Sequence, residues 1–210
     1  MKSLTGKEYF EMRIGARVAA ADEHGDKVLL LQDDTYLKLF RVKRWLTSAR
    51  FFPYWRRFEK NAAGLQSLEV PTLKVIESLR LPEIERTAVR YEPLPGVILR
   101  EVCDFDAHLV SKLGVFVKEL HDKGIYLRSL HLGNIVLTPQ NQLGLIDIAD
   151  MKIFRGPLRK GLRLRNLRHL WRYEEDRKAI SPYTQEFVRT FGKSYRSEVS
   201  SMFAPDTSVS

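Results

Sequence analysis

Two side chains in the second half of the chain are of the type that can bind magnesium. Asn134 opens the short apolar run 134–138, and Asp147 lies thirteen residues later in a second apolar run, 143–148. Magnesium prefers hard oxygen ligands, which the amide of Asn and the carboxylate of Asp supply. An ionised Asp147 within an apolar run costs free energy unless it is paired or bound to a metal. The alternative is that Asn134 begins a strand and Asp147 is a charge at its edge.

The elements around this pair must hold it in place. The two apolar runs are predicted to form a hairpin around Pro139–Asn141, which would bring the Asn and the Asp together on adjoining strands. A helix is predicted over 105–122, with Asp104 as its N-cap and Gly124 as its C-cap. Four apolar residues form one stripe along this helix: Leu109, Leu113, Val117 and Leu120.

The other expected elements are strands in the first half of the chain and helices near its end. Strands are predicted at 14–21, 27–32, 36–40, 72–80 and 86–92. A helix over 52–69 precedes the fourth of them. Lys38 lies in an alternating strand, on the face opposite to its Leu neighbours. Two further helices are predicted at 157–172 and at 182–195, the second opened by Ser181–Pro182.

The segment 119–137 resembles the catalytic loop of the protein-kinase-like superfamily, which reads H-R-D-L-x-x-x-N. Arg128 falls on the Arg of that motif, and Asn134 falls on its metal-binding Asn. Asp147 falls on the metal-binding Asp of the D-F-G motif, although Ile148–Ala149 replaces Phe-Gly. The resemblance implies phosphoryl transfer from ATP, with magnesium held by Asn134 and Asp147.

Two departures from the family pattern affect catalysis. Ser129 replaces the catalytic Asp, and a serine hydroxyl does not accept a proton at neutral pH as a carboxylate does. His131 and Asp150 are the candidates to take over as base, and for each the alternative is a purely structural role. No glycine-rich loop is present to cover the phosphates, because Gly25 is the only glycine within 16–63.

The resemblance also implies ATP-binding residues in the first half of the chain. Lys38 falls on the phosphate-binding lysine and Glu59 on its ion-pair partner, the alternatives being a strand lysine that reaches solvent and an exposed helix glutamate. The segment 91–96 looks like the hinge of aminoglycoside and sugar kinases, whose backbone binds adenine. Glu92 and Leu94 are the expected adenine-binding positions, and the alternative is a plain turn.

The implied fold is α+β and bilobal, as in protein kinases. The amino-terminal lobe, 1–93, would hold a small antiparallel sheet with one helix. A hinge at 94–96 would lead to a mainly helical carboxy-terminal lobe, 97–210, with ATP and magnesium bound between the lobes.

Positive charge gathers in one part of the sequence. The 210 residues include 35 Lys and Arg against 26 Asp and Glu, which gives a net charge of +9. The stretch 152–178 alone carries ten basic and three acidic residues. Its R-L-R-N-L-R-H-L-W-R-Y pattern looks like that of bacterial lipopolysaccharide core kinases, which act on heptose or 3-deoxy-manno-octulosonic acid, and of toluene-tolerance proteins. The basic helical segment 152–178 is expected to contact the anionic inner membrane peripherally, and the alternative is a solvated helical face.

Composition limits the remaining possibilities. A single cysteine, Cys103, excludes a disulfide framework and a multi-cysteine zinc site. The apolar runs are too short to span a membrane and the first residues do not read as a secretory signal, so a cytoplasmic location is expected. The predicted function is an ATP-dependent kinase for a sugar hydroxyl of lipopolysaccharide core or another anionic glycolipid. The alternative is a pseudokinase that acts as a binding module, while a nucleic-acid partner is disfavoured because no recognised binding module is present.

Overall fold

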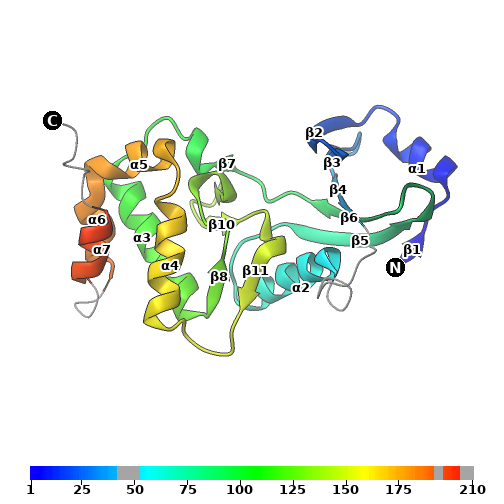
Figure 1. Cartoon of the computed structure of the whole chain (residues 1–210). Coiled ribbons are helices and arrows are strands. Elements are labelled where there is room, and N and C mark those ends of the chain that lie inside the picture. Colours follow the sequence, from blue (N-terminus) through cyan, green and yellow to red (C-terminus); the bar gives the residue numbers. More distant parts are fainter. Residues whose placement is uncertain (42–52, 192–195, 204–210) are drawn as a thin grey trace. The chain divides into compact units, whose positions relative to one another are not determined.

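The computed structural model describes residues 1–41, 53–191 and 196–203 and is an α+β protein (Figure 1). The chain divides into two compact units, an amino-terminal unit of residues 1–94 and a carboxy-terminal unit of residues 95–210. The division therefore falls within the segment 94–96. Of the described helices, none combines the length and the apolar character needed to cross a bilayer.

The amino-terminal unit contains a six-stranded mixed sheet in the order β1-β5-β6-β4-β3-β2. Its strands are β1 (Lys2–Ser3), β2 (Arg17–Asp22), β3 (Gly25–Leu30), β4 (Tyr36–Arg41), β5 (Lys74–Leu81) and β6 (Arg86–Glu92). Its helices are α1 (Gly6–Arg13) and α2 (Tyr54–Ser67). The five predicted strands and the helix before β5 are thus confirmed, with shifts of a few residues at their ends.

Two expectations for this unit are wrong. The sheet is not purely antiparallel, because the short strand β1 pairs in parallel with β5. A second helix, α1, precedes the first hairpin. Its sequence signal is a capping box, in which the Thr5 side chain accepts from the backbone of Glu8 and the Glu8 carboxylate accepts from the Thr5 N–H.

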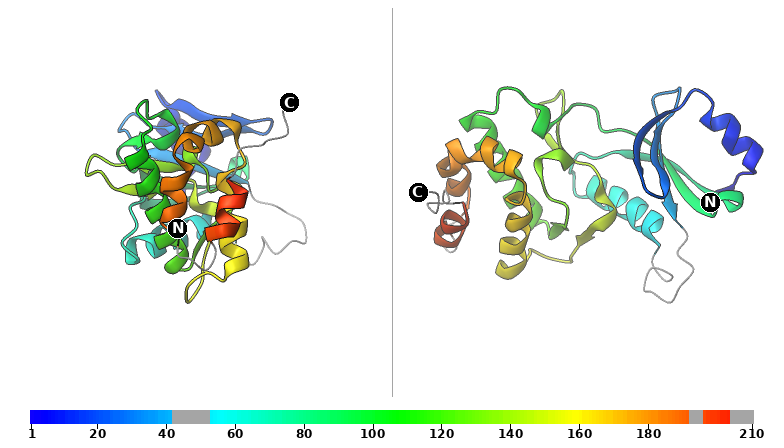
Figure 2. Two further views of the ribbon diagram at one scale, coloured as in Figure 1. Left: turned by 90° about the vertical axis from the view of Figure 1, so that its left-hand side faces the viewer. Right: turned by 45° about the horizontal axis from the view of Figure 1, so that its top comes forward.

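The two helices lie on opposite faces of the sheet (Figure 2). Leucines including Leu37 and Leu39 form a buried cluster on one face, against which Tyr9 and Met12 of α1 pack. On the other face, the Phe58 ring of α2 contacts strand aromatics. Alternation along β4 therefore places Lys38 on the α2 side, opposite to its leucine neighbours as predicted.

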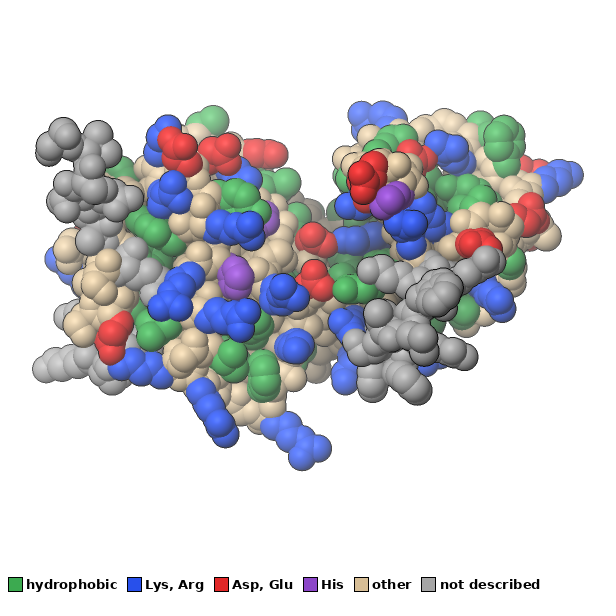
Figure 3. All heavy atoms as spheres, viewed as in Figure 1, with side chains coloured by type: hydrophobic (Ala, Val, Ile, Leu, Met, Phe, Trp, Pro, Cys, Tyr) green, Lys and Arg blue, Asp and Glu red, His purple; other side chains and the backbone are tan. Residues whose placement is uncertain are grey.

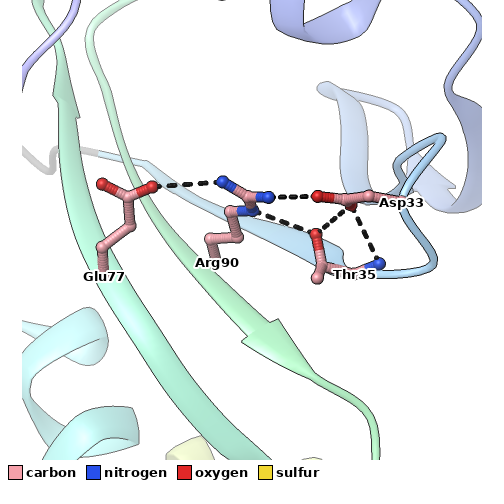
Figure 4. A network of polar contacts seen from close by, with 4 residues as sticks. All are labelled: Asp33, Thr35, Glu77 and Arg90. Carbon is pink, nitrogen blue, oxygen red and sulfur yellow. Dashed lines mark hydrogen bonds and ion pairs between the residues drawn. The ribbon is translucent and has the colours of Figure 1, made fainter.

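A polar network secures the connection between β3 and β4 (Figure 4). Arg90 of β6 donates from Nε to Thr35 Oγ1 over 3.0 Å and is ion-paired with Asp33. Its Nη1 lies 3.4 Å from the Glu77 carboxylate of β5. Because Arg90 lies opposite Leu37 in the register of β4 and β6, this network is on the face away from Lys38.

The carboxy-terminal unit combines helices with two small antiparallel sheets, one ordered β10-β9-β7 and the other pairing β11 with β8. Its strands are β7 (Val97–Ile98), β8 (Ile125–Leu127), β9 (Ile135–Leu137), β10 (Leu143–Leu145) and β11 (Met151–Ile153). Its α-helices are α3 (Ala107–Asp122), α4 (Lys160–Leu170), α5 (Glu174–Ile180), α6 (Thr184–Arg189) and α7 (Arg196–Met202). Short 3₁₀ turns include η3 (Leu99–Glu101), η4 (Leu132–Asn134), η5 (Ile148–Asp150) and η6 (Ser181–Tyr183).

The central helix and hairpin of this unit match the sequence expectations closely. All four residues of the predicted stripe are buried on α3. The N-cap is Asp106 and not Asp104, because the Asp106 carboxylate accepts from the Leu109 N–H over 2.8 Å. Lys123 caps the other end, and Gly124 follows it with a φ of 77°. Strands β9 and β10 form the predicted antiparallel hairpin.

The basic segment 152–178 is not helical throughout, which corrects the prediction. It begins within β11, whose main-chain pairing with β8 overrides the helical pattern, and only α4 and α5 supply helix. The predicted helix 182–195 is limited to α6 within the described residues, and 192–195 lie outside them. Ser181 is the C-cap of α5 and the first residue of η6, so it does not open α6.

A buried histidine links α3 to α4 and to β8. His121 is fully buried, and its Nε2 lies 3.1 Å from Asn166 Oδ1. Asn166 in turn donates to the Leu127 carbonyl over 2.6 Å. Burial lowers the pKa of His121 from 6.5 to about 4, because the charged imidazole would lose its hydration.

This burial predicts an acid-sensitive fold. Between pH 6.5 and about 4 the unfolded chain binds a proton at residue 121 that the folded chain excludes. The free energy of unfolding should therefore fall by about 3 kcal/mol as the pH decreases through this window, with no such loss above it. His121→Gln, which keeps an amide donor and does not titrate, should show a smaller loss in urea denaturation. His108→Gln, an exposed site on the same helix, is the matched control, and an unchanged pH dependence in His121→Gln would contradict the assignment.

Candidate functional site

The loop between β8 and β9 is held together by Asn134. Its side-chain Nδ2 donates to the Ser129 carbonyl over 2.9 Å, and its backbone N–H donates to the His131 carbonyl over 2.9 Å. The residue is buried at the end of η4. The amide nitrogen is already used within the loop. Oδ1 is therefore the side-chain atom that can accept a hydrogen bond or bind a cation.

Asp147 lies beside Asn134 but not in a strand. The backbone N–H of Ile146 donates to the Asn134 carbonyl over 3.0 Å, so the two loops meet one residue before Asp147. Strand β10 ends at Leu145, and Asp147 follows with φ 52° and ψ 51°, in the left-handed region. The expected location within a strand is therefore wrong. The side chain is exposed, so the cost of burying a charge does not apply to it.

The pair fits the usual protein contribution to a magnesium site. Asn134 Oδ1 and the Asp147 carboxylate are both hard oxygen donors. Within the part of the chain that the structure describes, no group of three or more His, Cys, Asp and Glu residues could hold a metal ion. Magnesium in nucleotide enzymes commonly takes one or two protein oxygens and completes its shell with phosphates and water. Two donors are therefore compatible with a nucleotide-bound magnesium and incompatible with an all-protein cage.

A buried carboxylate that the sequence did not reveal anchors this loop to α5. Asp176 has no exposed surface, and its Oδ2 accepts from the Leu132 N–H over 3.0 Å. Its Oδ1 accepts from Arg100 Nε over 2.8 Å. Asp176 thus fixes the backbone between Ser129 and Asn134. In the sequence, Asp176 is the third of three consecutive acidic residues, 174–176. Acidic residues are common in the first turn of a helix, so nothing there distinguishes Asp176.

His131 is packed between Arg100 and Tyr173. The Arg100 Nη2 lies 3.5 Å from His131 Nδ1, and the His131 and Tyr173 rings meet edge to face at 5.0 Å. Burial lowers the pKa of His131, and the nearby Arg100 lowers it further. A guanidinium can only donate, so Nδ1 accepts and the proton is assigned to Nε2. A role as general base would require His131 to lose this contact, and that role stays a prediction.

The other predicted catalytic residues differ in exposure. Arg128 follows β8 and is exposed, and Asp150 is exposed at the end of η5. Ser129 Oγ is buried and has no hydrogen-bond partner among the described residues. The structure therefore brings Ser129 and Asn134 into one loop, next to Asp147, and no described residue accepts a hydrogen bond from the Ser129 hydroxyl.

In the amino-terminal unit, Lys38 and Glu59 lie on the same side of the sheet. Lys38 Nζ is 5.3 Å from the centroid of the Phe58 ring, which precedes Glu59 on α2. The Glu59 carboxylate accepts from Ser78 Oγ of β5. Lys38 and Ser78 are both register partners of Val89, so they lie in one row across the sheet. The ion pair between Lys38 and Glu59 stays a prediction.

The two expected adenine-binding positions lie at the end of this unit. Glu92 is exposed at the end of β6, and its carboxylate pairs with Lys74 Nζ at 3.2 Å. Leu94 is half-buried. Neither observation tests the expected backbone contacts to adenine, which stay a prediction.

Comparison with known proteins adds no family assignment. A scan of family models and a search of curated proteins both found no match to this chain. The resemblance to kinases therefore stays a prediction from the motif residues of the sequence.

The anchor at Asp176 predicts a large effect of its removal on stability. Asp176→Ala leaves Arg100 without its closest carboxylate partner and the Leu132 N–H without its acceptor, and should lower the free energy of unfolding by about 3 kcal/mol. Glu175→Ala is the matched control, because Glu175 is exposed and lies 3.7 Å from the same guanidinium. Its effect in urea denaturation should stay within about 0.5 kcal/mol. Equal losses in the two variants would show that Asp176 is no anchor.

Proposed function

We propose that the protein is an ATP-dependent phosphotransferase of the lipopolysaccharide kinase type, which phosphorylates a sugar hydroxyl of an anionic glycolipid. The observation that carries the proposal is the joining of Asn134 to the residue before Asp147, in a loop that Asp176 anchors. Two oxygen donors next to a fixed loop are what binding of a magnesium nucleotide requires from this part of the chain. The bilobal kinase arrangement belongs to the same proposal.

Each residue then has a defined task. Asn134 and Asp147 would hold magnesium, which supplies charge neutralisation at the transferring phosphate when bound. Lys38 would bind ATP phosphates, with Glu59 positioning its ammonium group. Arg128 is exposed beside Ser129 and would orient the acceptor. These tasks are positioning and electrostatics, which supply most of the acceleration in phosphoryl transfer.

The missing base limits the expected rate. General-base assistance is worth about 10²–10⁴-fold, and Ser129 cannot give it. His131 or Asp150 would have to act as the base, or transfer would proceed slowly with the acceptor proton passing to solvent.

One observation favours a second candidate, a pseudokinase that binds nucleotide without transferring phosphate. The Ser129 hydroxyl is buried and lacks a partner among the described residues, so it is not directed at an acceptor by any contact there. In this case the fold and the Asn134–Asp147 pair would serve binding alone.

Binding of magnesium-ATP is the first test of the proposal. Asp147→Asn removes the charge but retains a residue that tolerates the left-handed backbone. Affinity for magnesium-ATP, measured by thermal shift or calorimetry, should fall at least about tenfold, or about 1.4 kcal/mol. Asp104→Asn, an exposed site in the same unit, should bind as the wild type does. No stabilisation of the wild-type protein by magnesium-ATP would overturn both candidates.

Phosphate transfer separates the two candidates. Wild-type protein should transfer phosphate slowly from ATP to purified core oligosaccharide, and Ser129→Asp should accelerate transfer by about 10²–10⁴-fold. Ser129→Asn is the control, because it matches the added size without supplying a base. Nucleotide binding with no transfer by the wild type would identify the pseudokinase.

A further inference from the structure

The ten basic residues of the segment 152–178 divide into two groups. Four of them make structural contacts inside the carboxy-terminal unit. Lys160 pairs with Glu198, Arg163 with Asp122, Lys178 with Glu174, and Arg177 donates to the carbonyls of residues 171 and 172. These four residues therefore do not belong to the single basic surface that the sequence predicted.

Three of the remaining arginines lie on or directly after α4. Arg165 and Arg168 are three residues apart on one face of this helix, and Arg172 follows its C-cap, Trp171. All three are exposed, while Leu167 and Leu170 are buried on the other side. Among the described residues, none of the three arginines forms an ion pair with a carboxylate.

Two further cations, Lys152 of β11 and Arg128 after β8, lie near these arginines. The hydroxyl of Tyr126 on β8 lies 3.3 Å from His169 Nε2 on α4. Lys152 of β11 is the register partner of Tyr126 and is exposed. Burial lowers the pKa of His169, and nearby positive charges, Arg128 among them, lower it further. Like the arginines, Lys152 and Arg128 form no carboxylate ion pair within the described chain.

These five residues form what is called here the basic face: Arg128, Lys152, Arg165, Arg168 and Arg172. Figure 3 shows Lys and Arg side chains gathered with histidine on the viewer's side of the carboxy-terminal unit. The face differs from the segment 152–178 in two ways. It leaves out the four internally bound cations as well as Arg155 and Arg159, and it gains Arg128 from the candidate catalytic loop.

Two apolar side chains are exposed directly after Lys152. Ile153 is 36% exposed and Phe154 is 42% exposed. The Phe154 N–H donates to the Gly124 carbonyl over 2.9 Å, which continues the pairing of β11 with β8. Extended backbone there places Phe154 on the same side as Lys152. Cations beside an aromatic side chain are the combination found in segments that lie in the headgroup region of a membrane.

We infer that the basic face and Phe154 together form a docking surface for an anionic membrane, with the cations on lipid phosphates and Phe154 in the headgroup region. Charge complementarity favours an anionic membrane as the partner. Within the described chain, the cations of the basic face do not pair with carboxylates and can therefore bind lipid phosphates. The inference extends the proposed function, because Arg128 directly precedes Ser129, so a membrane-borne acceptor would be held beside the catalytic loop.

Flotation with lipid vesicles tests the surface in the absence of nucleotide. Wild-type protein should float with vesicles of phosphatidylglycerol and phosphatidylcholine and not with phosphatidylcholine alone. Arg165→Gln/Arg172→Gln should lower the partition coefficient at least about tenfold, since each basic residue near an anionic surface contributes to binding. Lys160→Gln/Lys178→Gln is the matched control, because it removes the same charge from the same segment and should stay within about twofold.

The role of Phe154 has its own readout. Salt screens the contribution of the cations, so the binding that remains at high salt reports on the apolar contact. Phe154→Ser should remove this remainder, while its circular dichroism and melting temperature match those of the wild type.

Three results would overturn the inference. These are equal losses in the two double variants, no flotation of the wild type with anionic vesicles, or retention on an oligonucleotide that exceeds binding to vesicles. Because no ATP is present, each of these results leaves the nucleotide-binding and transfer experiments to judge the proposed function separately.

Discussion

The arrangement of the carboxy-terminal unit depends on one buried negative charge. Asp176 has no exposed surface, and a carboxylate in that position is tolerated only when every oxygen has a strong partner. Its two oxygens accept from Arg100 and from the Leu132 backbone, which come from distant parts of the sequence. The same Arg100 contacts His131. Satisfying this charge therefore fixes η3, the loop between β8 and β9 and α5 together, and this loop carries Asn134.

Positive charge serves two separate purposes in this chain. Arg163 is nearly buried, donates to the Leu158 carbonyl and pairs with Asp122, so it holds the start of α4 in the unit. Arg165 is exposed on the same helix and Arg172 is exposed just after its end, and neither pairs with a carboxylate among the described residues. A net charge cannot distinguish these cases, whereas the contacts of each guanidinium do. The basicity of the sequence is thus partly a feature of folding and partly a property of the surface.

Local patterns predicted local structure well in both units. Alternation in β4 gave the side of the sheet on which Lys38 lies, and the turn at 139–141 gave the hairpin that brings Asn134 near Asp147. Contacts between residues far apart in the sequence could not be predicted from such local patterns. Arg100 and Asp176 are separated by 76 residues, and neither has a local sequence signal for the contact. For the same reason β11 was missed, since its strand conformation comes from pairing with β8 and not from its own residues.

The backbone at Asp147 also restricts how this position can change. Left-handed φ and ψ values are readily adopted by Asp, Asn and Gly and by few other residues. Asn and Gly codons are each one nucleotide away from an Asp codon, and neither residue carries a carboxylate. These two replacements therefore preserve the turn while removing the carboxylate. If the proposed function holds, one nucleotide change would remove the proposed magnesium ligand and leave the fold intact, so an enzyme could become a binding protein in a single step.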